Sequence, residues 1–474
     1  MNYLNEEAIK QFRNILGDKH VKSSTAQLLA YSYDATANFQ RMPDVVLSPA
    51  NTQQVVEIVK VCDTYKIPII PRGSGTNLAA GTVPFDGGVI LLFNRMNQIV
   101  ECDKENLTIT VQPGVITQEI CNYVEPLGFF YPPDPSSMKI STIGGNVSEN
   151  SGGLRGLKYG VTKDYVKGLE VVLPNGQVLK TGGKLAKDVA GYDLTALLVG
   201  AEGTLGVITE ITLKLIPLPK SKMTSVAYFH SLEDAAKTVS AIIANKIIPV
   251  TLEFLDKKTI VAIEHSMKIG LPTDVEAMLL FEQDGEFEQV EKDVREMTQI
   301  AEENGAYVTQ IAKDDLEANQ IKTARRVALS ALSKLRPTVI LEDATVPRSQ
   351  IAEMVRRIHR IAEKYHVNIA TFGHAGDGNL HPTCLTDVRD EEEMERVEEA
   401  FAEIFEAALD LGGTITGEHG VGEMKAPYLE WKVGKAGIQV MKGIKHAFDP
   451  NNIMNPGKIF AKATKKRVMF HGVQ

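Results

Sequence analysis

The spacing of apolar residues along the chain alternates between helical and strand-like stretches. Apolar side chains recur on one helical face over residues 6–16, and residues 52–62 repeat this spacing after Asn51, which can cap a helix. Short apolar runs rich in β-branched residues predict strands at 45–47, 67–70, 87–93, 98–102 and 107–111. This mixture of helices and strands, without an internal repeat, predicts an α+β protein.

The stretch 71–84, between two of these strands, is a glycine-rich loop. Gly73 and Gly75 allow positive φ and expose consecutive backbone N–H groups, which can surround a phosphate. A Rossmann fingerprint needs a helix after the glycines and a third glycine three positions beyond the second. Position 78 is Leu78, and a strand rather than a helix follows. The loop therefore predicts a strand–loop–strand phosphate cradle, with a plain surface turn as the alternative from this loop alone.

Two further glycine-rich stretches follow, at 131–153 and 199–206. Six of the seventeen positions from 144 to 160 are glycine, so a loop is predicted there rather than a helix or strand. A β-hairpin is predicted for 166–179 and a strand for 207–215. The first two of the three glycine-rich loops are also stiffened by proline, and two such loops in one domain are more than chain reversal requires.

Residues 1–219 with these loops resemble the two-subdomain flavin-binding domain of the vanillyl-alcohol-oxidase (PCMH) type. In that fold the first loop holds the FAD pyrophosphate, and the other loops line the ribose and the isoalloxazine ring. The resemblance also matches a C-terminal asparagine to a residue near the flavin. The residues implied in FAD binding are Arg72, Gly73, Ser74, Gly75, Thr76, Asn77, Pro133, Asp134, Thr142, Gly144, Gly145, Asn146, Gly152, Gly203 and Asn455.

The residue inventory bears on how the flavin is held. Many relatives attach it covalently through a histidine beside the first loop. This chain has no histidine between His20 and His230, and its cysteines lie outside the glycine-rich loops. We therefore expect FAD to be bound without a covalent link.

After residue 220 the sequence is poor in glycine, and helical and strand-like patterns alternate. Helical patterns at 232–245, 288–304, 313–335 and 349–365 alternate with strands near 226–229, 250–254 and 278–281. This predicts a separate α+β cap domain for substrate over residues 220–412. Residues 413–474 are predicted to return to the first domain and to complete the active site and the flavin pocket.

The cap contains two histidines, His374 and His381, joined by a Gly-Asp-Gly turn at 376–378. Such a turn can fold back and direct both imidazoles at one point. Downstream, Glu418 and His419 are flanked by glycines, which let a second chain segment approach closely. Two histidines and one carboxylate form a ligand set that leaves a metal position open for substrate. The alternative to metal binding, for each histidine considered alone, is a purely structural role.

These motifs are similar to those of the FAD-linked 2-hydroxyacid dehydrogenases, which include the FAD-binding subunit of glycolate oxidase and the flavin D-lactate and D-2-hydroxyglutarate dehydrogenases. The resemblance implies that His374, His381 and Glu418 bind a divalent metal, Zn before Mn or Fe. It implies that His419 is the active-site base and that Arg325 binds the substrate carboxylate.

By this resemblance, the chain oxidises a small 2-hydroxyacid, glycolate or D-lactate, by hydride transfer to FAD. The electrons then pass to a partner, an iron–sulfur subunit or an electron-transferring flavoprotein. The sequence departs from relatives at Lys322, often tryptophan, and at 381–383, both near substrate contacts. D-2-Hydroxyglutarate, an aldonolactone or an aromatic alcohol therefore stays open as substrate, as does a flavin electron-transfer subunit with no substrate of its own.

The amino-acid composition limits which classes of partner and which cellular compartment are expected for this protein. With 51 basic and 60 acidic residues, the net charge of -9 disfavours nucleic acid. The four cysteines form no C-x-x-C pair, which indicates neither an iron–sulfur ligand set nor a disulfide framework. The sequence shows no signal peptide and no apolar run of the roughly 18 residues that a spanning helix needs. We expect a cytoplasmic protein that meets a membrane only through a partner; a homodimer and a hetero-oligomer both stay open.

Overall fold

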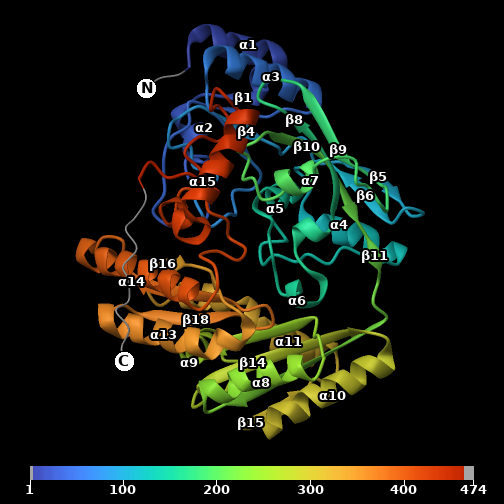
Figure 1. The fold of residues 1–474 in the computed structure, drawn as a ribbon, viewed down its shortest axis with the longest axis vertical. Helices are drawn as coiled ribbons and strands as arrows, with labels where there is room; N and C mark the ends of the chain where they lie inside the picture. Colours follow the sequence, from blue (N-terminus) through green and yellow to red (C-terminus); the bar gives the residue numbers. More distant parts are fainter. Residues whose placement is uncertain (1–3, 464–474) are drawn as a thin grey trace. The chain divides into compact units, whose positions relative to one another are not determined.

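The computed structural model describes residues 4–463, which form two compact units (Figure 1). The first unit comprises residues 4–151, 161–218 and 418–463, and the second comprises 152–160 and 219–417. The three-part domain division expected from the sequence stays a prediction, and residues 464–474 of its last part lie outside the described residues.

The first unit contains two main sheets. A four-stranded sheet has the order β1-β2-β4-β3, in which β2, β4 and β3 are parallel. A five-stranded antiparallel sheet has the order β5-β6-β10-β8-β9. Their bounds are Val21–Lys22 (β1), Val45–Leu47 (β2), Ile69–Arg72 (β3), Val89–Leu92 (β4), Ile99–Asp103 (β5), Thr108–Val111 (β6), Val166–Val172 (β8), Val178–Gly182 (β9) and Val207–Lys214 (β10). The short strands β7 (Phe129–Phe130) and β11 (Ile216–Pro217) pair separately.

Helices pack on these sheets through apolar faces. Asn51 accepts the N–H of Gln54 and so begins α3, whose inner face joins that of α1 in one core with β2, β3 and β4. Ile453 and Met454, which follow α15, enter the same core, and Met454 pairs with Ile69 of β3. The helices of this unit are α1 (Glu6–Leu16), α2 (Thr25–Leu29), α3 (Thr52–Tyr65), α4 (Thr117–Val124), α5 (Ile143–Glu149), α7 (Leu194–Leu198) and α15 (Leu429–Phe448).

The prediction of a loop throughout residues 141–153 is wrong, because residues 143–149 form helix α5. Thr142 caps this helix by accepting the N–H of Gly145 (3.3 Å), and the Asn146 side chain donates to Thr117 (2.6 Å). The local cap and this tertiary bond together offset the roughly 1 kcal/mol that each glycine costs inside a helix. Residues 156–159 also form a short helix, α6 (Gly156–Tyr159).

The second unit is built on one sheet whose paired strands are all antiparallel, in the order β15-β12-β14-β13-β18-β19-β16, with β17 paired to β19. The strands are β12 (Ser221–Phe229), β13 (Thr251–Asp256), β14 (Ala277–Gly285), β15 (Ala306–Ile311), β16 (Thr338–Leu341), β17 (Ala344–Thr345), β18 (Ile369–His374) and β19 (Asn379–Thr386). The helices are α8 (Leu232–Ala244), α9 (Lys257–Met267), α10 (Phe287–Glu303), α11 (Asp315–Arg326), α12 (Ala328–Leu332), α13 (Ile351–Tyr365) and α14 (Glu391–Asp410). The helix expected over 313–335 is therefore divided in two near Val327.

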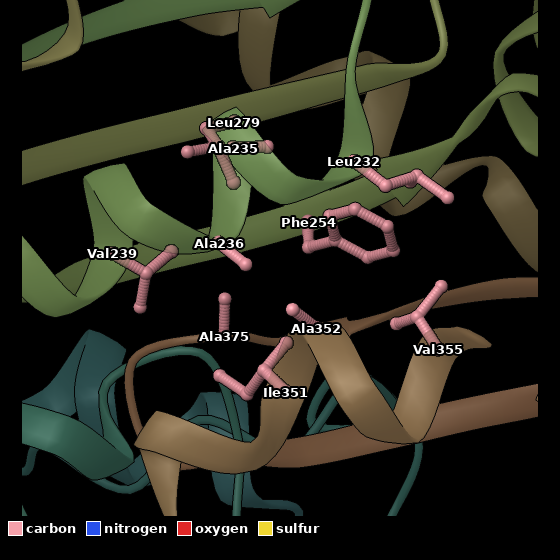
Figure 2. A pocket seen from close by; sticks show the side chains of 10 residues that line it. All are labelled: Leu232, Ala235, Ala236, Val239, Phe254, Leu279, Ile351, Ala352, Val355 and Ala375. Atoms are coloured by element: carbon pink, nitrogen blue, oxygen red, sulfur yellow. The ribbon is translucent and has the colours of Figure 1, made fainter. Parts of the chain in front are cut away.

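The two faces of this sheet differ in what they bury. On one face, α8 and α13 enclose a small cavity with Phe254 of β13 and Leu279 of β14, and all ten lining side chains are apolar (Figure 2). On the other face, Leu255 and Phe372 pack against α9, α11 and α12. Because side chains alternate along a strand, Glu253 points away from Phe254, to the face of Leu255. The apolar cavity thus offers no group that could bind a charged substrate.

Within residues 4–463, every helix is too short or too polar to cross a membrane.

Candidate functional site

The first glycine-rich loop follows β3, and the backbone N–H groups at its start are not used in bonds to the described part of the protein. Gly75 O accepts the N–H of Ala35, and Asn77 O accepts the hydroxyl of Thr36, so two carbonyl groups of the loop are bonded to residues 35 and 36. Among residues 4–463, the backbone N–H groups of residues 73–77 donate to no protein acceptor. Five successive free donors suit an anionic group such as a pyrophosphate. The loop therefore fits the cradle that the sequence predicted.

Two other predicted flavin residues of the first unit, Thr142 and Gly203, lie against this stretch. Ser74 Oγ donates to Ile140 O (2.5 Å), and Gly73 lies so close to Thr142 that an added Cβ would be 2.0 Å from its Oγ1. Gly203 packs on Pro71, since an added Cβ there would be 3.1 Å from that ring. The three glycine-rich stretches of the sequence therefore meet.

Asn455 fastens the C-terminal segment to two of these stretches. Its Nδ2 donates to Gly81 O (3.0 Å) and to Glu202 O (2.7 Å), and its backbone N–H donates to Ile69 O (2.8 Å). The C-terminal segment is thus joined to the first and third glycine-rich stretches through the side chain of Asn455. Arg72, Pro133 and Asp134 are buried in the same unit. Gly152 belongs instead to the second unit, with α6.

Glu202 holds the segment that carries His419. Its carboxylate accepts the N–H groups of Val421 (2.8 Å) and Gly422 (2.7 Å). Gly422 has φ +51° and lies so close to Ala79 that an added Cβ would be 1.8 Å from Ala79 O. Only glycine fits this approach of the segment to the end of the first loop. The sequence motif signalled the glycines but not the role of the carboxylate.

A second buried carboxyl group, that of Glu149, lies close to the same segment. Burial raises its pKa well above the usual value, and the neighbouring Glu202 raises it further. Its Oε2 is shut off from solvent and has no hydrogen-bond partner within the described chain. Burial raises the pKa of Glu202 as well, but its two backbone N–H donors favour the charged form and counteract that rise.

We expect Glu149→Gln to raise the melting temperature at pH 8 and to change it less at pH 5. The pKa of Glu149 is raised in the folded state, so the folded protein binds more protons than the unfolded chain above pH 4.5. Stability contributed by this group therefore falls as pH rises. Thermal unfolding of the flavoprotein at both pH values measures the effect, with the exposed Glu105→Gln as control. A lower melting temperature for Glu149→Gln at pH 8 would show that the charged form is the stabilising one.

The Gly-Asp-Gly turn does bring the two cap histidines together. Strands β18 and β19 form a hairpin in which Phe372 pairs with His381 and His374 with Asn379. The rings of His374 and His381 have centroids 5.2 Å apart and are nearly perpendicular. Both side chains are buried.

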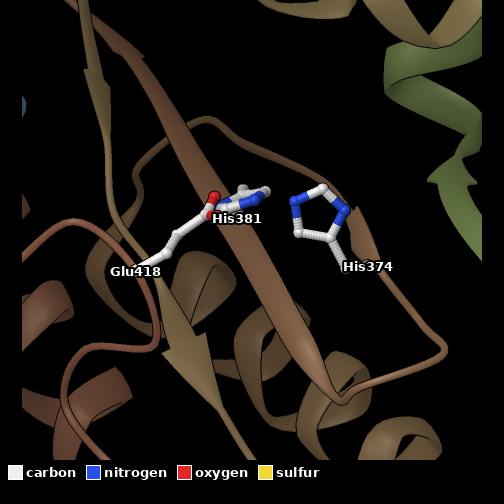
Figure 3. Close-up of side chains that lie close together, drawn as sticks. All are labelled: His374, His381 and Glu418. Atoms are coloured by element: carbon white, nitrogen blue, oxygen red, sulfur yellow. The ribbon is translucent and has the colours of Figure 1, made fainter. Parts of the chain in front are cut away.

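Glu418 completes a cluster with these histidines. It follows Gly417, whose N–H donates to Asp343 Oδ2 (2.6 Å) in the second unit. An added Cβ on Gly417 would be 2.2 Å from both Asn379 Nδ2 and Thr345 Oγ1, so glycine is required for this approach. His374, His381 and Glu418 each offer one ligand atom, and these three atoms lie within 4.8 Å of one another (Figure 3). Two imidazole nitrogens and one carboxylate oxygen at this spacing suit Zn²⁺ or a similar divalent ion.

His419 and Arg325, the predicted catalytic residues, are both mostly buried. His419 Nε2 lies 3.9 Å from Glu418 Oε1. Arg325, near the end of α11, donates its Nε–H to Glu253, and its guanidinium carbon lies 4.8 Å from the centroid of the Phe372 ring. One turn earlier in α11, Lys322 forms an ion pair with Glu282 (2.6 Å).

Sequence reasoning missed Glu253, which accepts from both Arg325 and His374. The available signal was the one charged residue in the mostly apolar strand predicted for 250–254. A buried charge in such a strand needs a partner, and that need marks it as a residue with a role.

Comparison with known proteins agrees with this geometry. Residues 43–182 match the FAD binding domain family, and residues 218–459 match the family of FAD linked oxidases, C-terminal domain. The chain belongs to the FAD-linked oxidases and is a flavoprotein oxidoreductase. The prediction of this membership from the sequence is confirmed.

Relatives of known name are similar over nearly their whole length. The chain is 61% identical to glycolate oxidase subunit GlcD of Bacillus subtilis, covering 98% of this chain and 99% of that protein. It is 36% identical to D-lactate dehydrogenase of Anaerostipes hadrus, covering 97% and 98%. Among solved structures, p-cresol methylhydroxylase aligns with a TM-score of 0.81 at 20% identity, covering 96% of each chain. The predicted α+β flavoprotein fold is confirmed by this similarity.

Proposed function

We propose that this protein oxidises a small 2-hydroxyacid, glycolate or D-lactate, to the 2-oxoacid and passes the electrons to a partner protein. The observation that carries the proposal is the cluster of His374, His381 and Glu418, with Arg325 on the same sheet face as the two histidines. The names of the relatives, a glycolate oxidase subunit and a D-lactate dehydrogenase, support the same substrate class.

The residues of the first unit would hold FAD without a covalent bond, through the free N–H groups of residues 73–77. Bound FAD would supply the acceptor for the hydrogen on C2 of the acid, as a hydride. The chain's part is to align the acid and to exclude water, which the burial of the surrounding side chains favours.

The residues of the cluster would hold a divalent metal, for which Zn²⁺ is the first candidate. Such an ion would supply Lewis-acid stabilisation of the oxygen that loses its proton. Arg325 would bind the substrate carboxylate, because its Nη1 and Nη2 groups make no hydrogen bond to protein among residues 4–463. His419, adjacent to the ligand Glu418, would take the hydroxyl proton as general base.

Electrons would leave through another protein. Within the described residues, His374, His381 and Glu418 form the one group of metal-ligating side chains, and no cysteines gather into an iron–sulfur site. A partner with iron–sulfur clusters, or an electron-transferring flavoprotein, would therefore reoxidise the flavin.

We expect glycolate or D-lactate to bleach the flavin absorbance of the purified protein under anaerobic conditions. The test panel also contains L-lactate, D-2-hydroxyglutarate and an aromatic alcohol, each with and without a strong chelator. The chelator should suppress bleaching while the protein stays yellow, because the flavin and metal residues are different. A flavin that dithionite reduces but no 2-hydroxyacid does would overturn the proposal in favour of an electron-transfer subunit.

A further inference from the structure

Glu253 is a carboxylate placed where a charge is costly. It lies in the middle of β13, its side chain has no exposed surface, and its strand neighbours Leu252, Phe254 and Leu255 are buried apolar residues. Burying an ionised carboxylate costs several kcal/mol unless charged partners and hydrogen bonds compensate. The partners of Glu253 therefore show what the charge is for.

Each oxygen of Glu253 has a different partner. Oε1 lies 2.6 Å from Nδ1 of His374, and Oε2 accepts the Nε–H of Arg325. The register that pairs Phe254 with Gly373 places Glu253 opposite His374 across β13 and β18. One carboxylate thus joins a proposed metal ligand to the proposed substrate-binding arginine.

For His374, the contact decides which nitrogen is the ligand atom. A carboxylate accepts a hydrogen from Nδ1, so the neutral ring carries its proton on Nδ1 and leaves the Nε2 lone pair for a metal. The same contact fixes the ring plane, which stands nearly perpendicular to that of His381.

For Arg325, the contact decides which edge of the guanidinium is used. Glu253 takes the Nε–H, and the ring of Phe372 lies 4.8 Å from the guanidinium carbon and covers one side. The Nη1/Nη2 edge is then the one that presents two parallel donors, the arrangement that suits a carboxylate.

We propose that Glu253 is the positioning residue of the site: it holds His374 in the Nδ1–H tautomer and turns the Nη1/Nη2 edge of Arg325 to the substrate carboxylate. The metal and the acid are thereby aligned through one side chain that touches neither. This inference rests on the proposed function for the acid, whereas its part concerning His374 can be tested without any turnover.

The principal test is Glu253→Gln, which keeps the shape but offers only one acceptor oxygen to two donors. We expect the affinity of the flavoprotein for Zn²⁺, measured by competition with a chromophoric chelator, to fall roughly 10- to 100-fold. The Kd of glycolate or D-lactate, measured by anaerobic flavin reduction, should rise as well. Arg325→Lys should raise the Kd of the acid and leave Zn²⁺ affinity unchanged.

Glu282→Gln is the matched control, since it removes another largely buried ion pair of the same sheet, that with Lys322. It should leave Zn²⁺ affinity at the wild-type value.

A double-mutant cycle then separates positioning from general destabilisation. In a His374→Asn background, Glu253→Gln should weaken Zn²⁺ binding little further. An equal loss in both backgrounds, or a wild-type Zn²⁺ affinity for Glu253→Gln alone, would overturn the proposal.

A measurement on the wild-type protein covers the case in which Glu253→Gln does not fold. The imidazole ¹⁵N signals of His374 are assigned as those that disappear in His374→Asn. Their chemical shifts should show a protonated Nδ1 and a Zn²⁺-bound Nε2. Ligation through Nδ1 would overturn the inference. Failure of every acid to bleach the wild-type flavin would instead refute the proposed function and leave the result for His374 standing.

Discussion

Replacing His374 with alanine is expected to abolish flavin reduction by the 2-hydroxyacid while the protein keeps its yellow colour. The variant removes one of the three proposed metal ligands, whose atoms lie within 4.8 Å of one another. Lewis-acid stabilisation by a metal is worth several kcal/mol, and each 1.36 kcal/mol is a factor of ten in rate. The rate constant for flavin bleaching in a stopped-flow experiment should therefore fall by roughly a thousandfold or more.

The control for this variant is His265→Ala, at an exposed position of α9 in the same unit. It should retain wild-type bleaching and wild-type Zn²⁺ content. Added Zn²⁺ should not rescue His374→Ala at concentrations that saturate the wild-type protein. Rapid bleaching by a metal-free His374→Ala protein would mean that the cluster has a structural role only.

Replacing His419 with glutamine is expected to slow flavin reduction by about 10²–10⁴-fold, the usual contribution of a general base. Glutamine can still form hydrogen bonds but cannot take the hydroxyl proton. Because Glu202 holds the backbone of Val421 and Gly422, the segment should stay in place. The Kd of the acid and the Zn²⁺ content should then change by no more than a few-fold.

His446→Gln, at an exposed position of α15, serves as the comparison for His419→Gln. It should react at the wild-type rate. A large rise in the Kd of the acid with an unchanged limiting rate for His419→Gln would assign that side chain to substrate binding and would refute its role as base.

Much of the fold was predictable because its signals are local. The strands Val45–Leu47 and Thr108–Val111 and the helices Glu6–Leu16 and Thr52–Tyr65 follow the apolar spacing of their own residues. The absence of a helix after Gly75 distinguished the loop from a Rossmann turn, and the parallel strand β4 does follow it. The Gly-Asp-Gly turn likewise brought His374 and His381 together, since the hairpin needs only the residues between them.

Helix α5 and the carboxylates of Glu253 and Glu202 were not predictable in the same way. The glycine content of residues 144–153 argued against a helix, but the cap from Thr142 and the bond from Asn146 to Thr117 decide otherwise. Glu253 meets Arg325 and His374, which are 72 and 121 residues away in the chain. Glu202 meets Val421 across 219 residues. Local spacing carries no information on such pairs.

The sequence by itself determined which residue types are present for the chemistry: free donors in a glycine-rich loop, a His-rich turn, and a glycine-flanked Glu-His pair. These follow from covalent neighbours and backbone freedom, which act within a few residues. Only the tertiary structure decided which nitrogen of His374 faces Glu253, which donor of Arg325 this carboxylate accepts and what holds the segment that carries His419. Those outcomes depend on buried carboxylates whose charge is tolerable only where distant strands and helices bring them partners.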